Sequence, residues 1–318
     1  MKMALLKKFD FVDLFAGIGG MRLAFEAAGG RCVLTCEIDD SALKTYKANF
    51  NPIHSHEYVR DIKDAKNLPM HDVLVAGFPC QPYSIAGLRK GLKDKRGQVF
   101  LEIIRILKSS KPQAFLLENV KGMRSHDGGR TFEFMLQRLE DCGYYLCHET
   151  LNSSVHANVP QNRERVFVVG FRDKEMAKKF KFPEPVRLRK TIKSFISKSV
   201  AEDRYYYDSR FDCFKEIKKV VTSPETVYQW RRKYVRENKS NMCPALTANM
   251  GSGGHNVPLI RVGSKIRKLT PRECAKFQGF PKDFILPKIS DSKLYHQFGN
   301  SVTVPLIERI ATAMTDVM

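Results

Sequence analysis

Long apolar runs, zinc-type cysteine spacing and an apolar leader are all missing from this sequence. No segment has the apolar length of a membrane span, which argues against a membrane-spanning protein. The eight cysteines show no paired spacing, so no metal site is expected. Lys7 and Lys8 interrupt the apolar start at Met3 to Leu6, so we expect no secretory signal. We therefore expect a cytoplasmic protein whose cysteines are reduced thiols.

Acidic residues are also scarce, because 34 Asp and Glu stand against 54 Lys and Arg, which gives a formal net charge of +20. Such an excess attracts polyanions, either nucleic acid or an anionic membrane surface. The sequence contains no basic amphipathic helix or lipidation motif that would favour the membrane. Half of the net charge lies between Phe171 and Ser240, where we count 20 basic and 10 acidic residues. Nucleic acid is the predicted partner, and a solvated lysine-rich surface is the alternative.

Strand-like and helix-like segments alternate over the first half of the chain. Apolar runs predict strands at 9–16, 31–36, 72–76 and 114–117, and amphipathic patterns predict helices at 20–28, 39–49, 98–109 and 131–142. This alternation predicts an α/β fold with a doubly wound, mostly parallel sheet. Two consecutive strands are expected at 144–151 and 163–171. The sequence then becomes charged and irregular, until regularity returns at 267–280 and in a helix at 304–315.

A glycine turn follows the first predicted strand, in the run Asp13-Leu14-Phe15-Ala16-Gly17-Ile18-Gly19-Gly20. Glycines at such a turn let the backbone approach a ligand at a helix N-terminus. Arg22 occupies the place of the third glycine of the dinucleotide fingerprint, which disfavours a nicotinamide cofactor. Glu37 ends the next strand, where a carboxylate can accept from ribose hydroxyls, and Asp61 is placed to accept from an exocyclic amine. The pattern fits a nucleoside site, and an ordinary α/β glycine turn is the alternative.

Cys80 is the candidate nucleophile, in the run Gly77-Phe78-Pro79-Cys80-Gln81-Pro82-Tyr83-Ser84. It follows a predicted strand, and ligands of open α/β sheets bind beyond the carboxyl ends of strands. Pro79 and Pro82 restrict the backbone on both sides and would aim the thiol at a fixed point. Most cysteines are instead small core residues, and the polar loop that follows Cys80 argues against that alternative.

Six motifs follow one another along the chain. They are the glycine turn at 13–20, Pro-Cys-Gln at 79–81, Glu-Asn-Val at 118–120, Gln-Asn-Arg-Glu-Arg at 161–165, the segment 267–281, and Gln-Phe-Gly-Asn-Ser-Val at 297–302. In this order they make the chain similar to the DNA (cytosine-5)-methyltransferases of bacterial restriction-modification systems. The resemblance covers nearly the whole length apart from about 171–240. The resemblance implies a Rossmann-like S-adenosylmethionine-dependent fold with a smaller, irregular target-recognition domain.

The reaction of this family explains the residue types. The Cys80 thiolate adds to carbon 6 of a flipped cytosine, which makes carbon 5 nucleophilic toward the methyl group of S-adenosylmethionine. Glu118 would donate a proton to ring nitrogen 3, which requires that its pKa be raised. The alternative is that Glu118 is a structural carboxylate. By resemblance Arg165 binds the 2-oxo group and Arg163 supports the site; strand alternation predicts both arginines on one face. A surface pair with local carboxylates is the alternative, chiefly for Arg163.

The resemblance also assigns binding residues. Ile38 stands where the family often has tryptophan, so apolar contact replaces ring stacking there. Residues 84–97, with three glycines and five basic residues, would form a lid over DNA, or an ordinary basic loop. The cofactor residues are Asp13, Phe15, Ala16, Gly17, Gly19, Gly20, Glu37, Ile38, Asp61, Ile62, Pro79, Asn300 and Val302. The DNA-contacting residues are Gln81, Ser84, Arg89, Arg96, Asn249, His255 and Asn256, whereas basic residues at 218–219 and 231–233 are expected to contact phosphates.

The resemblance further implies domains and partners. Residues 1–180 and 300–318 would form the catalytic domain, 181–265 the target-recognition domain and 266–299 a bracing segment, in which Arg272 and Glu273 fit an internal ion pair. We expect a monomer acting on double-stranded DNA in the cytoplasm at the nucleoid, with a possible cognate endonuclease but no stable complex. One family branch methylates tRNA, but its Cys-Phe-Thr element is absent here. A DNA-binding module without turnover is the other alternative, against which Cys80, Glu118 and Arg165 argue.

Overall fold

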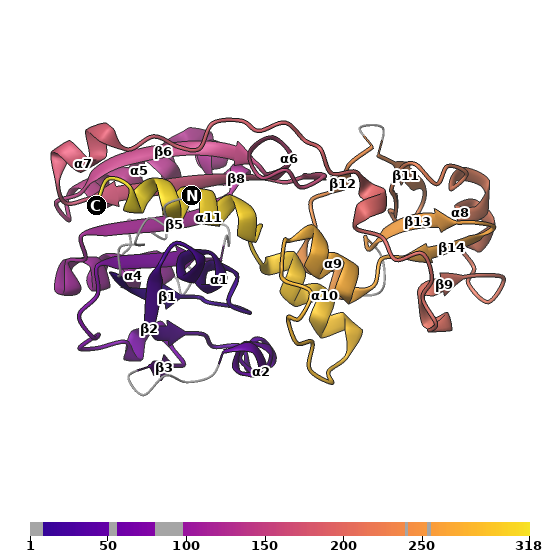
Figure 1. The fold of residues 1–318 in the computed structure, drawn as a ribbon, viewed down its shortest axis with the longest axis horizontal. Helices are drawn as coiled ribbons and strands as arrows, with labels where there is room; N and C mark the ends of the chain where they lie inside the picture. The colour runs from indigo at the N-terminus through magenta and orange to yellow at the C-terminus, as the bar shows by residue number, and fades with distance from the viewer. Residues whose placement is uncertain (1–8, 51–55, 80–97, 239–240, 253–255) are drawn as a thin grey trace, which may run out of the picture. The chain divides into compact units, whose positions relative to one another are not determined.

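The computed structural model describes residues 9–50, 56–79, 98–238, 241–252 and 256–318, and the chain divides into two compact units (Figure 1). The first unit comprises residues up to Leu151, Glu164–Glu184 and Pro305–Met318. The second comprises Asn152–Arg163 and Pro185–Val304. No helix among the described residues is both long and apolar enough to cross a membrane.

The first unit is built on a sheet of seven strands in the order β3–β2–β1–β4–β5–β8–β6. The pairs β2–β3, β1–β2, β1–β4 and β4–β5 are parallel, and β8 pairs antiparallel with β5. The prediction of a mostly parallel, doubly wound sheet is confirmed. The strands are Phe9–Leu14 (β1), Gly30–Cys36 (β2), Glu57–Val59 (β3), Val73–Gly77 (β4), Ala114–Val120 (β5), Tyr145–Asn152 (β6) and Glu164–Phe171 (β8).

Helices cover both faces of this sheet because successive strand residues point in opposite directions. Val12 and Leu14 pack in a buried cluster with apolar residues of α4 and α5, whereas Phe11 packs on Phe25 of α1 with ring centroids 5.5 Å apart. Asp13 follows this alternation onto the α1 side. The unit's helices are Gly20–Ala27 (α1), Asp40–Asn49 (α2), Gln98–Ser110 (α4), Arg130–Glu140 (α5), Lys174–Lys179 (α7) and Val304–Thr315 (α11), with 3-10 turns Ile62–Asp64 (η1) and Lys121–Gly129 (η2).

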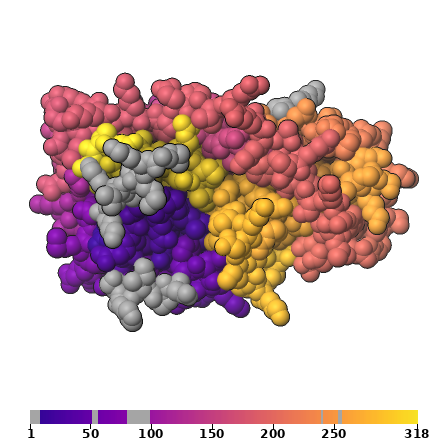
Figure 2. Space-filling view, viewed as in Figure 1, coloured from indigo at the N-terminus to yellow at the C-terminus, as the bar shows by residue number. Residues whose placement is uncertain are grey.

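The C-terminal helix α11 brings the end of the chain back to this unit. Leu306, Ile307 and Ile310 are buried at no more than 2% exposure. On the surface of the unit, part of the yellow C-terminal segment lies beside indigo N-terminal residues (Figure 2). The helix expected at 304–315 is confirmed with the same bounds.

The second unit contains an antiparallel sheet where the sequence predicts irregular structure. Its five strands have the order β11–β10–β13–β14–β9. Tyr228, Leu259 and Ile266 form a small core with Ile217 of α8 (Phe214–Val220) and with Val221, which follows α8. These strands are mostly two to five residues long, too short for periodicity to reveal them. The strands are Tyr206–Tyr207 (β9), Tyr228–Trp230 (β10), Val235–Glu237 (β11), Pro258–Val262 (β13) and Lys265–Lys268 (β14), and Gln161–Asn162 (β7) pairs separately with Cys243–Pro244 (β12).

Short helices complete the second unit. Gly299 of α10 lies so close to the 247–248 backbone that a Cβ atom would come within 2.1 Å of Thr247. Gly251 likewise packs against Ser292 of α10, so its small size serves packing within the unit. The helices are Ser153–His156 (α6), Phe214–Val220 (α8), Pro271–Phe277 (α9) and Asp291–Asn300 (α10), with 3-10 turns Ile192–Ser194 (η3), Asp203–Tyr205 (η4) and Ala248–Gly251 (η5).

A buried ion pair joins three segments of the second unit. Arg267 donates to both carboxylate oxygens of Glu273 at 2.7 and 2.8 Å, and both side chains are fully buried. Glu273 also accepts from the backbone N–H of Ser197 and of Thr270, which completes a capping box on α9. Arg272 instead donates to the Phe284 carbonyl at 2.6 Å. The partner of Glu273 is therefore Arg267, six residues earlier on β14, and not its neighbour Arg272.

Removal of Glu273 should destabilise the protein strongly. The variant Glu273→Ala leaves the Arg267 guanidinium buried without its carboxylate, which costs about 3–5 kcal/mol. The free energy of unfolding from urea denaturation measures this loss. Glu225→Ala is the matched control, because Glu225 pairs with Lys193 on the surface of the same unit at 58% exposure, where a pair contributes about 0–1 kcal/mol. Equal losses in the two variants would contradict the prediction.

Candidate active site

The strand order places a ligand site at the carboxyl ends of β1 and β4. From β1 the chain proceeds outward through β2 to β3, whereas β4 returns to the other side of β1 and is followed outward by β5. Ligands of open α/β sheets bind at this kind of switch point, beyond the carboxyl ends of the strands. The segments that follow β1 and β4 are the glycine turn and Phe78-Pro79-Cys80.

The glycine turn has the backbone geometry that its sequence predicts. Gly17 and Gly19 have φ values of +56° and +86°, in the left-handed region that favours glycine. A Cβ atom on Gly17 would have no atom of the described residues within 4 Å, so this side of the turn is open to that part of the chain. Helix α1 begins at the buried Gly20, and Ala16 donates its N–H to the Cys36 carbonyl at 3.0 Å. Phe15 also has a positive φ, of 56°, and packs partly against the core.

Glu37 fixes the turn from the end of β2. Its carboxylate accepts from the N–H of Gly17 and of Asp39, each at 2.7 Å, and burial raises its pKa. Both oxygens keep a lone pair for a further donor. The neighbouring Ile38 is 64% exposed, an unusual position for a large apolar side chain. Together they offer an acceptor and an apolar surface next to the open glycine turn, a combination that fits a nucleoside.

The remaining predicted cofactor residues of the first unit differ in exposure. Asp61 caps the turn η1 through the N–H of Lys63 at 3.0 Å. Ile62 is buried at 6% exposure, so only its backbone can face a ligand. Pro79 is exposed at the end of the described segment.

A buried polar cluster that the sequence analysis missed lies beneath the glycine turn. Asp13 is completely buried, and its carboxylate makes no hydrogen bond of standard geometry among the described residues, although the backbone N–H of Arg22 faces it. Burial raises the pKa of Asp13 to about 8, opposed by the charge of Arg22. Arg22 is 3% exposed, pairs with Glu26 at 2.6 Å and lies over the Phe50 ring at 4.5 Å. Asp13 therefore lies beneath the turn, away from its solvent-facing side.

Phe50 completes this support. A Cβ atom on Gly19 would lie 2.2 Å from the Phe50 ring, so the ring packs directly on the glycine that precedes α1. The guanidinium of Arg22 covers the same ring and donates to the Tyr46 hydroxyl at 3.1 Å. The sequence signal for this contact is Arg22 on the apolar face of a predicted helix. The sequence analysis uses Arg22 only to argue against the dinucleotide fingerprint.

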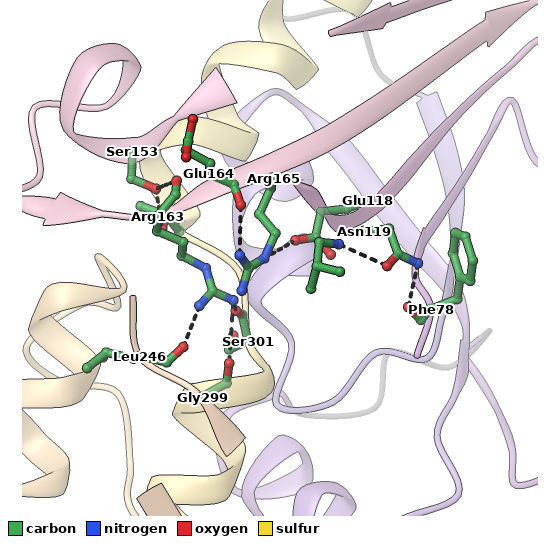
Figure 3. A network of polar contacts seen from close by, with 12 residues as sticks. Phe78, Glu118, Asn119, Ser153, Arg163, Glu164, Arg165, Leu246, Gly299 and Ser301 are labelled. Atoms are coloured by element: carbon green, nitrogen blue, oxygen red, sulfur yellow. Dashed lines mark hydrogen bonds and ion pairs between the residues drawn. The ribbon is translucent and has the colours of Figure 1, made fainter. Parts of the chain in front are cut away.

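Glu118 and Arg165 form an ion pair at the end of β5 (Figure 3). The antiparallel register places Arg165 opposite Val120 and therefore diagonally across from Glu118, within reach of a long side chain. Arg165 Nε lies 3.1 Å from Glu118 Oε1, and the side chains are 15% and 10% exposed. Another guanidinium nitrogen of Arg165 donates to the Glu164 carbonyl at 2.8 Å, which fixes the direction of the group.

Asn119 connects β5 to the segment after β4. Its amide donates to the Phe78 carbonyl at 3.1 Å and its oxygen accepts from the N–H of Val120 at 2.9 Å (Figure 3). Phe78 is two residues before Cys80, so Asn119 fixes the backbone that leads to the candidate nucleophile. The predicted residues Cys80, Gln81, Ser84, Arg89, Arg96 and His255, and the lid at 84–97, lie outside the described residues.

Arg163 belongs to the second unit and has a different environment from Arg165. It precedes β8, so the strand alternation that predicts one shared face does not extend to it. Its guanidinium donates to the carbonyls of Leu246, Gly299 and Ser301 at 2.7, 3.4 and 2.5 Å (Figure 3). The side chain is 2% exposed, so the structure fits a positioning role within this unit and not contact with a base.

Four other predicted residues lie in the second unit. Asn300 is exposed at the end of α10 and bonds His296 at 3.0 Å, and Val302 is buried at 7% exposure. Asn249 is exposed in the turn η5. Asn256 has a left-handed φ of 68°, and its N–H donates to the Trp230 carbonyl at 3.3 Å.

Comparison with known proteins supplies the family. Residues 9–316 match the model of the C-5 cytosine-specific DNA methylases. The chain is 50% identical to the Type II methyltransferase M.Bsp6I of Bacillus sp. (strain RFL6), over 95% of this chain and 97% of that protein. It is 40% identical to the Type II methyltransferase M.DsaV of Dactylococcopsis salina, over 97% of this chain and 86% of the relative.

Solved structures share the fold. The Entamoeba histolytica methyltransferase EhMeth superposes with a TM-score of 0.72 at 18% identity and covers 98% of both chains. The S. pombe Dnmt2 methyltransferase has a TM-score of 0.71 at 18% identity and covers 98% of this chain and 99% of its own.

Asp13→Asn tests the buried carboxyl. With a pKa near 8 in the folded state, Asp13 keeps its proton between about pH 4 and pH 8 while the unfolded chain loses it. This group therefore makes the wild type less stable as pH rises through that window, by up to about 1.4 kcal/mol per pH unit. Relative to wild type, the variant's free energy of unfolding should increase between pH 5 and pH 8 in urea denaturation.

Asp64→Asn, at an exposed position of the same unit, controls for the loss of one carboxyl and should show a nearly constant difference. A difference for Asp13→Asn that falls with pH would mean that Asp13 is ionised in the folded protein.

Proposed function

The chain belongs to the C-5 cytosine-specific DNA methylase family, and from this premise we propose that Cys80, Glu118 and Arg165 carry out its methyl transfer. The enzyme methylates carbon 5 of cytosine in DNA, and S-adenosylmethionine supplies the methyl group as an electrophile. The observation that carries the assignment is the Glu118–Arg165 ion pair at the end of β5, next to the segment that leads to Cys80.

The residues after β1 and β2 would bind the cofactor. Glu37 would accept from the ribose hydroxyls, and Ile38 would cover one face of the adenine. Asp61 and the Ile62 backbone would face the adenine edge, and the open turn at Gly17 would receive the methionine portion. The other proposed cofactor residues are Asp13, acting from below the turn, and Phe15, Ala16, Gly19, Gly20, Pro79, Asn300 and Val302.

The other cysteines support Cys80 as nucleophile. A cysteine adds to a pyrimidine as its thiolate, which requires a pKa that is not raised by burial. Burial raises the pKa of Cys32 and Cys36 to about 12. It also raises the pKa of each of the other described cysteines, which are Cys142, Cys147, Cys213, Cys243 and Cys274. These thiols are poorly suited to nucleophilic attack.

The proposed roles follow from the chemistry of the ring. The Cys80 thiolate adds to carbon 6, and Glu118 donates a proton to ring nitrogen 3. The product is a neutral enamine in which carbon 5 is nucleophilic. Arg165 donates to the 2-oxo group and keeps Glu118 oriented through their ion pair. After carbon 5 has received the methyl group, loss of the carbon 5 proton, elimination of the thiolate and return of the nitrogen 3 proton to Glu118 restore the neutral aromatic ring. Arg163 acts as a positioning residue through its three carbonyl contacts.

The wider assignments are also proposals. We infer a restriction-modification role because the relatives at 50% and 40% identity are Type II methyltransferases. We propose that a separate endonuclease shares the recognised sequence without a stable complex, and that the enzyme acts as a monomer on nucleoid DNA in the cytoplasm. The antiparallel sheet and the +20 net charge support the proposal that residues 181–265 recognise the target sequence. Residues 1–180 and 300–318 would form the catalytic domain, and residues 266–299 would brace the recognition domain. Gln81, Ser84, Arg89, Arg96, Asn249, His255 and Asn256 are the proposed DNA contacts.

Trapping on DNA that contains 5-fluorocytosine tests the nucleophile. Fluorine at carbon 5 cannot leave as a proton does, so the wild type should remain covalently bound to duplex DNA in the presence of S-adenosylmethionine. Cys80→Ser should form no adduct and transfer no methyl group while it still binds DNA, and Glu118→Gln should form the adduct slowly. Denaturing gel electrophoresis measures the adduct. A covalent complex with Cys80→Ser, or wild-type methylation of tRNA but not duplex DNA, would refute the proposal.

Asn119→Asp tests the support of the nucleophile segment. The variant keeps the oxygen that accepts from Val120 but loses the amide that donates to the Phe78 carbonyl. A misplacement of about 1 Å can cost about a hundredfold in rate, so we expect kcat to fall by about ten- to a hundredfold with little change in KM for S-adenosylmethionine.

Asn49→Asp is the control, because it removes an amide donor from the Thr45 carbonyl within helix α2. Its kcat should stay close to that of the wild type. A wild-type kcat for Asn119→Asp would show that the Phe78 contact does not position the nucleophile.

A further inference from the structure

The turn that joins β10 to β11 presents four consecutive exposed residues, Arg231, Arg232, Lys233 and Tyr234. We call these four residues the hairpin tip. Three are cationic, and Tyr234 is 58% exposed, one of the few large apolar or aromatic side chains of the described chain that face solvent. An exposed aromatic ring within a cationic turn is a combination that nucleic-acid-binding surfaces use.

The backbone of the hairpin tip is well defined. Arg231 donates its N–H to the Tyr234 carbonyl and Lys233 donates to the Arg231 carbonyl, each at 2.9 Å. Arg232 has a φ of 67°, a left-handed conformation that a non-glycine residue adopts only when its surroundings impose it. Trp230 and Val235 form the last strand pair below the tip and pack against the small core of the sheet. The tip is therefore an ordered projection on a packed base.

A second segment is attached at the base of the hairpin tip. Asn256 donates its N–H to the Trp230 carbonyl at 3.3 Å, and its own carbonyl accepts from the Gln229 side chain at 3.3 Å. Gln229 is 7% exposed, so this contact is largely shielded from water. The structure thus places Asn256, which follows the glycine-rich segment, beside the end of β10. Asn256 thus lies next to the residue that precedes the hairpin tip, and we consider Asn256 and the tip together as one candidate surface.

We propose that this surface reads the DNA sequence, with Tyr234 as a specificity-determining contact. The proposal rests on the proposed function of the chain. A two-stranded ribbon fits the major groove, where an asparagine amide can pair with adenine and a tyrosine ring can contact a thymine methyl group or a base edge. Arg231 and Lys233 contact the flanking phosphates. Phosphate contacts fix the place of a protein on DNA but do not distinguish one base from another.

The experiment compares sequence words and charges. Bisulfite sequencing of plasmid DNA methylated by the wild type first defines the recognised word. Initial rates of methyl transfer are then measured on duplex oligonucleotides with this word and with each single-base change. Tyr234→Ala should lower kcat/KM on the recognised word by about tenfold, chiefly through KM for DNA, and should reduce the preference over changed words. Tyr234→Phe separates the ring from the hydroxyl.

The cationic residues should give a different pattern. Arg231→Gln with Lys233→Gln should lower kcat/KM about equally on all words and reduce the salt dependence of binding by about one unit of slope per charge removed. Tyr145→Ala and Lys174→Gln are matched controls in the first unit, where Tyr145 is 46% exposed and Lys174 lies over its ring at 5.9 Å. Both controls should keep the wild-type rates and preference.

The possible results distinguish the inference about Tyr234 from the proposed function of the chain. Wild-type rates and preference for Tyr234→Ala would overturn the inference, and so would an equal loss on every word. Retained kcat at saturating DNA and an unchanged thermal melting curve would show that Tyr234→Ala is folded. Failure of the wild type to methylate any duplex DNA would refute the proposed function itself.

Discussion

Parallel pairing of β1 with β4 and of β4 with β5 is the constraint on which the first unit depends. Parallel neighbours end at the same edge of a sheet, so three segments far apart in sequence meet there. These are the glycine turn after β1, the Phe78 segment after β4 and Glu118 on β5. The antiparallel strand β8 then contributes Arg165 from the opposite direction. A single pairing pattern brings the glycine turn, the Phe78 segment and the Glu118 carboxyl group to one edge.

The two units contain buried charges that are stabilised in different ways. In the second unit, Arg267 and Glu273 satisfy each other bidentately, and both also bond the backbone of Ser197, so the pair fixes the geometry of α9 and the strand before it. In the first unit, Asp13 has no such partner, and burial raises its pKa to about 8 instead. A neutral carboxyl beneath the glycine turn avoids the cost of a buried anion. Arg22 remains paired with Glu26 and stacked on Phe50.

The sequence predicted the first unit better than the second unit, for a physical reason. Long apolar strands and amphipathic helices carry a strong period, and the glycines at 17 and 19 have the left-handed φ values that their positions imply. The short strands of the second unit carry too few residues for a period to emerge. The burial of Arg22 was not predicted, because a charged side chain on a helix is normally exposed to solvent. Here the Phe50 ring and two polar partners, Tyr46 and Glu26, compensate for the loss of hydration of the guanidinium.

Arg163 and Arg165 show the limit of reasoning from alternation. Both arginines fit one strand face by spacing, but the strand begins at Glu164, and only Arg165 lies on it. Arg165 pairs with Glu118 in the first unit, whereas Arg163 holds the Leu246 segment and the end of α10 in the second. Gln161 belongs to the same motif and bonds the Leu246 N–H as well. One short motif therefore contributes an ion-pair partner of Glu118 in the first unit and the support of the Leu246 segment in the second, because the chain passes from one unit to the other within it.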